Sequence, residues 1–279
     1  AEQQAWGEPA CMLTGAEAEA LEPAVNFHGA TQVASSPRDG AIDPVLVSKA
    51  LVAAAIQQGA QVLERCEVLG VDDSSDQKGK LLRTSCGPIE ADRVVLATGP
   101  DPVAVKRFGG FDLPQRSTPG VIVVTRPVKP LLRGILVAPG IHIHQRKDGR
   151  LVIGEQEGAP DTAAHADRLA DRPKRFPDDL VADQHAQRLL ATTRDYLPSI
   201  GEVEVDEVLI GWRPLPVDGH PVIGPSPADD RVYVAIMHSG VSLAAITGDL
   251  VARELADGLE MALLRPFRAN RVFDTKNRY

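Results

Sequence analysis

The sequence lacks the features that most often reveal what a protein does. It carries a formal net charge of −8 over 279 residues and no long basic run, which argues against a nucleic-acid surface and favours small-molecule partners. Its longest apolar runs, such as VYVAIM at 232–237, are far shorter than the roughly 20 residues that cross a bilayer. The N-terminus has no basic and then apolar leader. We therefore expect no nucleic-acid partner and no membrane span.

Cysteine is scarce, and the common cofactor motifs are missing. The three cysteines, Cys11, Cys66 and Cys86, are an odd number at no metal or redox spacing, which favours buried thiols in a reducing compartment. We expect a cytoplasmic protein without a metal site. A dinucleotide fingerprint needs two glycines two residues apart, and no pair in this chain has that spacing. The sequence also has no GxxxxGK phosphate loop and no HExxH pair.

Among the features that are present, the clearest is a helix signal. Asp43 can cap a helix whose first residue is Pro44, apolar residues follow at helical spacing, and Gly59 suits a left-handed C-terminal position. The sequence predicts a helix over about 44–58. After it, 60–71 and 80–86 read as strands, 87–92 as a turn, and RVVLATG at 93–99 as a short, buried, parallel strand.

A second, sheet-rich region follows from Gly110 to about Val205. Several antiparallel strands are expected there, with a hairpin turn at 147–149. The polar stretch 158–179 is predicted to be a surface loop, and Asp183 to begin a helix that runs to Pro198. The last part, 230–258, predicts a strand, a turn at 238–240 and a helix ending near Gly258.

Five blocks in this order resemble the flavin-dependent oxidoreductases related to D-amino acid oxidase, glycine oxidase and sarcosine oxidase. They are DGAIDPVLVSKALVAAAIQQGAQV, ADRVVLATGP, DGRLVIGE, GWRPLPVDGHPVIG and VYVAIMHSGVSLAAITGDLVARELADG. The resemblance implies an α/β fold with an FAD/NAD(P)-binding Rossmann-like domain at 40–110 and 205–279. An interleaved antiparallel-sheet substrate domain, of α+β type, is implied at 1–39 and 111–204. Family members open with a strand, GxGxxG and a helix, so the flavin domain is expected to be incomplete at its N-terminus.

The resemblance also implies a set of residues that bind FAD. The backbone of Val68 corresponds to a position that contacts adenine, although core packing explains an isolated valine as well. A turn before the last helix would lie against the flavin ring, because a helix start offers free N–H groups and a positive dipole end. Its alternative is a helix packed closely on a sheet, which small residues also allow. The implied contacts are Thr98, Gly99, Ser239, Gly240, Val241, Ser242 and Leu243.

Arg213 is the strongest candidate for binding a substrate. Its neighbours Trp212 and Pro214 stiffen the segment, and a guanidinium can hold a carboxylate through two parallel hydrogen bonds. The family's corresponding arginine binds the amino acid substrate in this way, whereas a structural salt bridge is the alternative. His142 and His144 alternate on one strand and share a face, and His142 aligns with a substrate-pocket position. His142 and His238 are candidates to tune the protonation of the amine.

The resemblance thus implies that the chain oxidises an amine or amino acid at its C–N bond to an imine, with FAD as the cofactor. The alternative is a partial subunit that binds no flavin alone and acts with a partner chain, by self-association, or as a carboxylate-binding module. A parallel sheet without its first strand leaves apolar surface uncovered, which makes such a partner physically attractive.

Overall fold

This computed structural model of the chain describes residues 2–155, 176 and 179–274. The chain divides into two compact units, each built from two separate stretches of sequence. Unit 1 comprises Ala1–Ile42 and Pro119–Trp212, and unit 2 comprises Asp43–Thr118 and Arg213–Tyr279. The sequence predicts flavin-binding and substrate domains at 40–110 with 205–279 and at 1–39 with 111–204, and this assignment stays a prediction.

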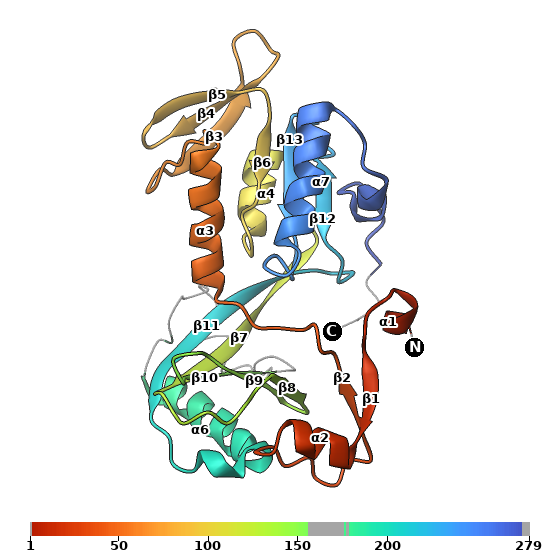
Figure 1. Cartoon of the computed structure of the whole chain (residues 1–279). Helices are drawn as coiled ribbons and strands as arrows, with labels where there is room; N and C mark the ends of the chain where they lie inside the picture. The colour runs from red at the N-terminus through yellow and green to blue at the C-terminus, as the bar shows by residue number, and fades with distance from the viewer. Residues whose placement is uncertain (1, 156–175, 177–178, 275–279) are drawn as a thin grey trace. The chain divides into compact units, whose positions relative to one another are not determined.

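Unit 1 is built on a five-stranded sheet with the order β11-β7-β10-β9-β8 (Figure 1). Antiparallel pairs set its register, with Val152 opposite both Val124 and His144. The predicted hairpin turn at 147–149 joins β9 to β10, and Gly149 there has a φ of +90°. The strands are β7 (Gln115–Thr125), β8 (Ile135–Ala138), β9 (Ile141–Gln145), β10 (Leu151–Glu155) and β11 (Val205–Pro216).

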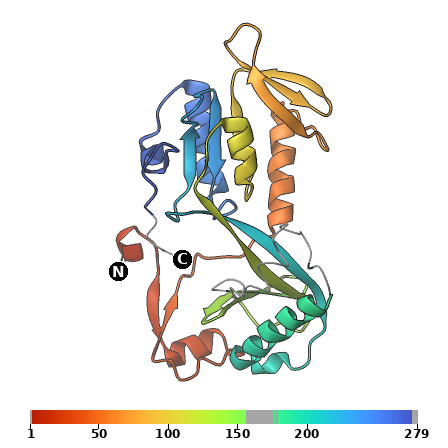
Figure 2. The same cartoon turned by 180° about the vertical axis from the view of Figure 1, so that it is seen from behind.

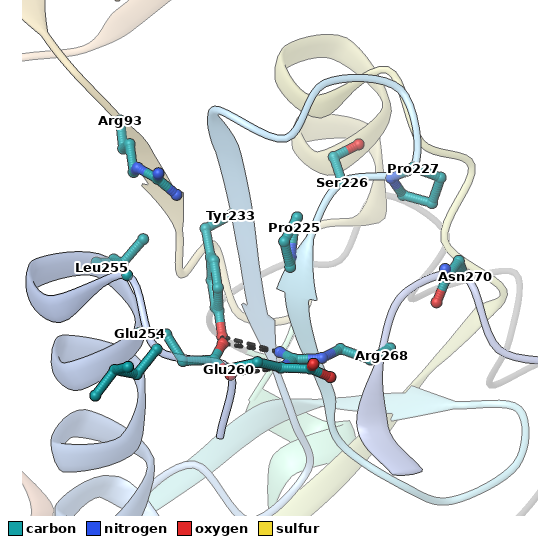
Figure 3. A pocket seen from close by; sticks show the side chains of 12 residues that line it. Arg93, Pro225, Ser226, Pro227, Tyr233, Glu254, Leu255, Glu260, Arg268 and Asn270 are labelled. Carbon is teal, nitrogen blue, oxygen red and sulfur yellow. Dashed lines mark hydrogen bonds and ion pairs between the residues drawn. The ribbon is translucent and has the colours of Figure 1, made fainter. Parts of the chain in front are cut away.

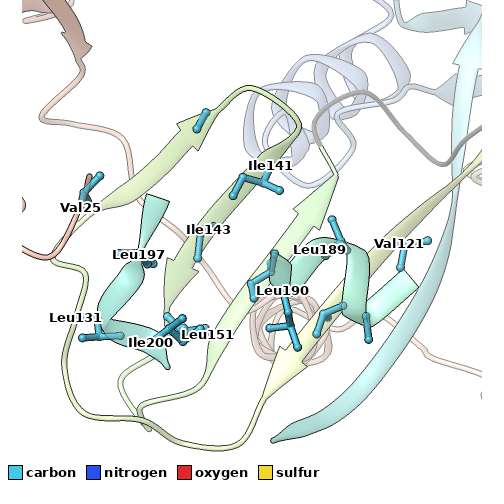
Figure 4. Packing of buried hydrophobic residues seen from close by; sticks show 14 residues of the cluster. Val25, Val121, Leu131, Ile141, Ile143, Leu151, Leu189, Leu190, Leu197 and Ile200 are labelled. Atoms are coloured by element: carbon cyan, nitrogen blue, oxygen red, sulfur yellow. The ribbon is translucent and has the colours of Figure 1, made fainter. Parts of the chain in front are cut away.

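Helix α6 (Asp179–Tyr196) provides the main helical part of the core of this unit. It begins at Asp179, before the predicted Asp183, because the apolar spacing already starts at the buried Val181. Figure 4 shows its Leu189 and Leu190 in one cluster with side chains of the sheet. The loop predicted at 158–179 lies almost entirely outside the described residues. The remaining elements of unit 1 are α1 (Glu2–Ala5), β1 (Cys11–Thr14), α2 (Gly15–Leu21), β2 (Gln32–Ser35) and the 3-10 helix η1 (Pro198–Ile200).

Unit 2 contains a three-stranded sheet with the order β12-β13-β6. Strand β6 (Val94–Leu96) runs parallel to β13 (Val232–Ile236), and β12 (Val222–Pro225) is antiparallel to β13. Helix α4 (Pro102–Gly109) packs on one face through Val105, while α7 (Ala244–Asp257) and the 3-10 helix η2 (Ala262–Phe267) cover Tyr233 on the other. The parallel strand predicted at 93–99 is therefore present, but shorter, and its central Val95 is 42% exposed rather than buried.

A second sheet of unit 2 is a meander of β3 (Val68–Asp73), β4 (Lys80–Thr84) and β5 (Gly87–Ala91). The predicted turn at 87–92 is wrong. The chain reverses at 85–86 instead, and Gly87, which has a φ of +113°, already pairs with Thr84 as the first residue of β5. Pro88 is tolerated because β5 is an edge strand. The strand predicted at 60–71 begins only at Val68. The mixed α/β fold with an antiparallel-sheet part is confirmed.

Charged side chains connect the meander to the β13 sheet. Lys80 Nζ donates to Asp73 Oδ1 and Asp229 Oδ2, both at 2.8 Å, and its side chain is only 7% exposed. Arg231 donates to the same two carboxylates. Hydrogen bonds from Arg231 and Lys80 hold the pKa of Asp229 far below its usual range. The loop before β13 is thereby fixed against β3 and β4.

Helix α3 (Pro44–Gln57) forms as predicted, with the Asp43 carboxylate accepting from the N–H groups of Val45 and Leu46 at 2.9 and 3.0 Å. None of its residues is buried. In both views it lies on the side of β6 away from β13 (Figures 1 and 2). A helix that is apolar on all sides is normally covered on all sides. The large side chains that it exposes are Val45, Leu46, Leu51, Val52 and Ile56.

Candidate functional site

The carboxyl ends of β6 and β13 form the centre of the candidate site in unit 2. Because the two strands are parallel, the segments that follow them leave the sheet at the same edge. Residues 97–100 follow β6, and 237–243 lead from β13 into α7. Ligands of open parallel sheets bind at this edge. The topology thus brings Thr98 and Gly99 to the same edge as the predicted turn.

Gly99 is required by its backbone conformation. Its φ is +63°, which an L side chain rarely adopts, and a Cβ there would meet no atom within 4 Å. The Thr98 hydroxyl donates to the carbonyl of Asp101 at 3.4 Å, and Asp101 caps α4 by accepting from Val103 N at 3.0 Å. The loop after β6 is therefore shaped by local bonds and open on the side that Gly99 faces.

The turn before α7 is solvent-exposed from His238 to Ser242. Leu243 N donates to Ser239 O at 2.9 Å and Ala244 N to Val241 O at 3.3 Å. Within the described part of the chain, the N–H groups of Gly240, Val241 and Ser242 have no hydrogen-bond partner. A helix start with unused N–H groups attracts negative charge.

Close packing does not account for Gly240. A Cβ there would lie 3.8 Å from Met237 Cγ and O, an ordinary contact, and the backbone is not left-handed. Gly248 in α7 has no atom within 4 Å of an added Cβ. The alternative, that these small residues allow α7 to pack closely on the sheet, is not supported at Gly240 or Gly248.

Arg213 and His238 act on one another electrostatically. Partial removal of the exposed His238 ring from water, and then the charge of Arg213, lower the pKa of His238, while its Nδ1 lies 3.3 Å from Ser239 Oγ. Arg213 is half-buried in β11. Among the residues that the structure describes, no carboxylate forms an ion pair with it. The salt bridge considered as its alternative role is thus absent from this part of the chain.

A buried ion pair between Arg271 and Asp218 fixes the loop after β11. Arg271 donates to both Asp218 oxygens, at 2.8 and 3.0 Å, and to the carbonyl of His220 at 3.2 Å. Burial opposes ionisation of Asp218, but the Arg271 hydrogen bonds prevail and lower its pKa. The partners lie 53 positions apart, so no local pattern could pair them.

The other predicted residues lie elsewhere in the fold. His142 belongs to unit 1, on β9, where its ring covers Gly154 so closely that an added Cβ would clash with Nε2. His144 shares its face, as predicted, and burial, Arg146 and His142 lower its pKa. Val68 begins β3 of the meander, beside a register shift between Val68 and Gly70. The thiols expected to be buried are not, because Cys11 and Cys86 are exposed and Cys66 is partly so.

A pocket of about 440 Å³ lies on the α7 side of the same sheet (Figure 3). Glu254 at its base accepts from the Tyr233 hydroxyl and from Arg268, and Met261 N donates to it at 2.7 Å. Burial and the hydrogen bond to Glu254 raise the pKa of Tyr233 well above its usual range. These groups satisfy one another, so the cluster supports the packing of α7 on β13.

The described residues also lack two other kinds of feature. They contain no group of three or more His, Cys, Asp or Glu side chains able to hold a metal ion. None of their helices is both long and apolar enough to span a membrane.

Comparison with known proteins decides the family. Residues 1–254 match the family model described as FAD dependent oxidoreductase. The chain belongs to this family of FAD-dependent oxidoreductases. It is 31% identical over 269 residues to the glycine oxidase of Geobacillus kaustophilus, covering 95% of this chain and 67% of that protein. The crystal structure of glycine oxidase from that organism aligns with a TM-score of 0.80 at 30% identity, covering 98% of this chain and 70% of the other.

The FAD-dependent oxidoreductases that this chain matches are longer than the chain. The glycine oxidase of Bacillus subtilis is 29% identical over 216 residues, which are 76% of this chain and only 53% of that enzyme. The chain therefore spans between half and two thirds of the length of these two relatives.

FAD is the cofactor of this family, and the site in unit 2 fits part of it. The exposed turn offers unused N–H groups at Gly240, Val241 and Ser242, and the backbone at Gly99 borders open space. Both lie where parallel sheets bind ligands. A pyrophosphate-binding glycine pair, by contrast, is not among these 279 residues.

Proposed function

We propose that this chain carries the substrate side and one edge of the flavin site of an enzyme that oxidises an amine or amino acid to an imine. The observation that carries the proposal is Arg213, a guanidinium with no carboxylate partner among the described residues, close to His238 and the turn before α7. The relatives named glycine oxidase support an amino acid as the substrate class.

Arg213 supplies the binding energy for the substrate carboxylate. A planar guanidinium donates two parallel hydrogen bonds to a carboxylate. Holding the carboxylate there fixes the neighbouring carbon and its amine relative to the turn 238–243. FAD, when bound beside the turn, would supply the redox chemistry by accepting hydride from that carbon.

His238 keeps the surroundings of the amine suited to reaction. Desolvation and the charge of Arg213 lower the pKa of His238 and so favour its neutral form, in which the imidazole adds no positive charge that would repel the amine. The turn has a separate role. Its N–H groups at Gly240, Val241 and Ser242, with the positive end of α7, stabilise negative charge beside them.

The test is Arg213→Lys, with Arg253→Lys as the matched control on an exposed pair with Asp249. An ammonium keeps the charge of Arg213 and loses the planar fork. Because such bonds contribute about 1.5–3 kcal/mol, amino acids should bind on the order of tenfold to a hundredfold more weakly. Their amides should bind both proteins equally poorly. Binding is followed by the change in flavin absorbance on titration.

Two results would reject Arg213 as the carboxylate site. The first is unchanged affinity for amino acids in the Arg213→Lys protein. The second is a loss of affinity for carboxylates and amides alike at unchanged flavin content. Circular dichroism and the flavin content of both variants separate these results from simple unfolding.

A second candidate role, as part of a larger assembly, is favoured by the exposed surface of α3. We propose that a further polypeptide segment, joined to this chain or separate, covers α3 and adds a strand parallel to β6. Five large aliphatic side chains of α3 are exposed, and the outer edge of β6 has no strand partner in the described residues. Val95 on β6 is exposed as well. The free edge of β6, which lies beside exposed apolar side chains, is able to pair with an added strand.

Hydrogen exchange tests this role. The chain is produced with and without the polypeptide encoded directly upstream of it, and exchange is measured for the amides of 44–57 and 94–96. Protection of both segments only in the longer product supports the proposal, and Leu51→Lys should reduce that protection. If both segments exchange equally fast in the two products, no such segment covers them. Protection that appears only as the concentration of the chain alone rises would instead indicate a second copy.

A further inference from the structure

Two cysteines lie close together beyond the end of the β3–β4 ladder. The antiparallel register pairs Val68 with Thr84. Past this pair, Ser85 N donates to Glu67 O at 2.9 Å and Glu67 N donates to Ser85 Oγ at 2.9 Å. Cys66 precedes Glu67, and Cys86 follows Ser85 in the turn between β4 and β5.

A shared hydroxyl confirms that the two residues are close. Cys66 Sγ donates to Thr84 Oγ1 at 3.2 Å, and Cys86 N donates to the same oxygen at 3.1 Å. Both thiols are free, Cys86 is exposed and Cys66 is partly so. Neither thiol therefore needs a large opening of the structure to react.

The side-chain contacts place the two thiols within reach of each other. Cys66 and Cys86 hydrogen-bond to each other as well as to Thr84. No local sequence pattern indicates this pair, because Cys66 lies before β3 and Cys86 lies in the β4–β5 turn.

We propose that Cys66 and Cys86 form a reversible disulfide that joins the segment before β3 to the β4–β5 turn. The residues before β3, 60–67, form no helix or strand of their own. The bond would close a loop from 66 to 86 and fix the start of β3, which stabilises a fold mainly by restricting its unfolded chain. This disulfide is independent of the proposed oxidation of an amine or amino acid.

A small-molecule disulfide such as oxidised glutathione is the oxidant. The Cys66 thiolate attacks one sulfur of oxidised glutathione and releases one glutathione thiolate. The Cys86 thiolate then attacks Cys66 Sγ and releases the second. The two cysteines lose two electrons to the two glutathiones, which also take up the two thiol protons. Cys66 attacks first because hydrogen bonding with Cys86, and then with Thr84, lowers its pKa, whereas Cys66 raises the pKa of Cys86.

The experiment uses the Cys11→Ser protein, which keeps only the two cysteines of interest. It is equilibrated in buffers of reduced and oxidised glutathione and alkylated, and its peptides are mapped by mass spectrometry. We expect a Cys66–Cys86 crosslink that forms without retained glutathione and that dithiothreitol reverses. In the matched Cys11→Ser/Cys86→Ser protein, Cys66 should stop at a mixed disulfide with glutathione. The oxidised crosslinked protein should also unfold at a higher temperature than the reduced protein.

Any of three outcomes would overturn the proposal. The two cysteines would each carry glutathione without a crosslink, they would join separate molecules only, or both would stay reduced under conditions in which the exposed Cys11 of the parent protein is glutathionylated.

Discussion

At the scale of single residues, the presence or absence of a carboxylate partner distinguishes the structural arginines from Arg213, the candidate for substrate binding. Arg231, Arg268 and Arg271 each meet a carboxylate in a largely buried setting. Arg213 meets none among the described residues. An unpaired guanidinium that is half removed from water is able to bind a ligand carboxylate, whereas a paired one holds the fold together.

Removal of Arg271 tests the structural class. Arg271→Leu leaves the Asp218 carboxylate, 7% exposed, without its partner, and we expect a loss of about 3–5 kcal/mol in the free energy of unfolding. The control Arg253→Leu removes an exposed pair with Asp249 and should cost no more than about 0.5 kcal/mol. Both free energies come from urea unfolding.

The loss should also depend on pH. The folded-state pKa of Asp218 lies below the unfolded value of about 3.9. The contribution of the pair is therefore fully present above that pH and disappears as the pH falls through the folded-state pKa. The parent and Arg271→Leu should converge in stability on acidification, and a constant difference down to low pH would contradict this assignment.

At the scale of elements, sequence predicts best where the signals are local. Helix α3 forms at its predicted position because its cap, Asp43, and its first residue, Pro44, are neighbours in sequence. The turn predicted at 87–92 failed because one left-handed glycine, Gly87, reverses the chain two residues earlier and turns an apparent loop into an edge strand. The exposure of the α3 side chains could not be predicted from the sequence either, because the spacing of apolar residues along a helix does not show which other elements pack against it.

The turn before α7 is the element on which flavin binding depends in this account. Gly240→Val should fold normally, because an added Cβ makes only ordinary contacts. It should still lose FAD, because the new side chain occupies the space beside the unused N–H groups. Gly40→Val, at another open glycine, is the control and should keep FAD. Equal falls in melting temperature and FAD content for Gly240→Val would instead mean that the glycine serves the fold.

At the scale of the whole molecule, the family and the broad fold were predictable, while the site was predictable only in part. Blocks distributed along the chain carried the resemblance, and residues 1–254 match the family. Thr98, Gly99 and the turn meet at one sheet edge because β6 and β13 are parallel. Contacts between distant residues, such as Asp218 with Arg271 and Cys66 with Cys86, leave no local pattern, so only the folded chain reveals them.

The most direct test is the cofactor content of the protein purified from its host, together with any polypeptide that stays associated with it. We predict a yellow protein whose visible absorbance is released as FAD on denaturation. We also predict that this absorbance falls when an amino acid is added without oxygen, and that the corresponding amide has no effect. A colourless protein that takes up no added FAD, or bound FAD whose absorbance no amine or amino acid changes, would contradict the proposed function.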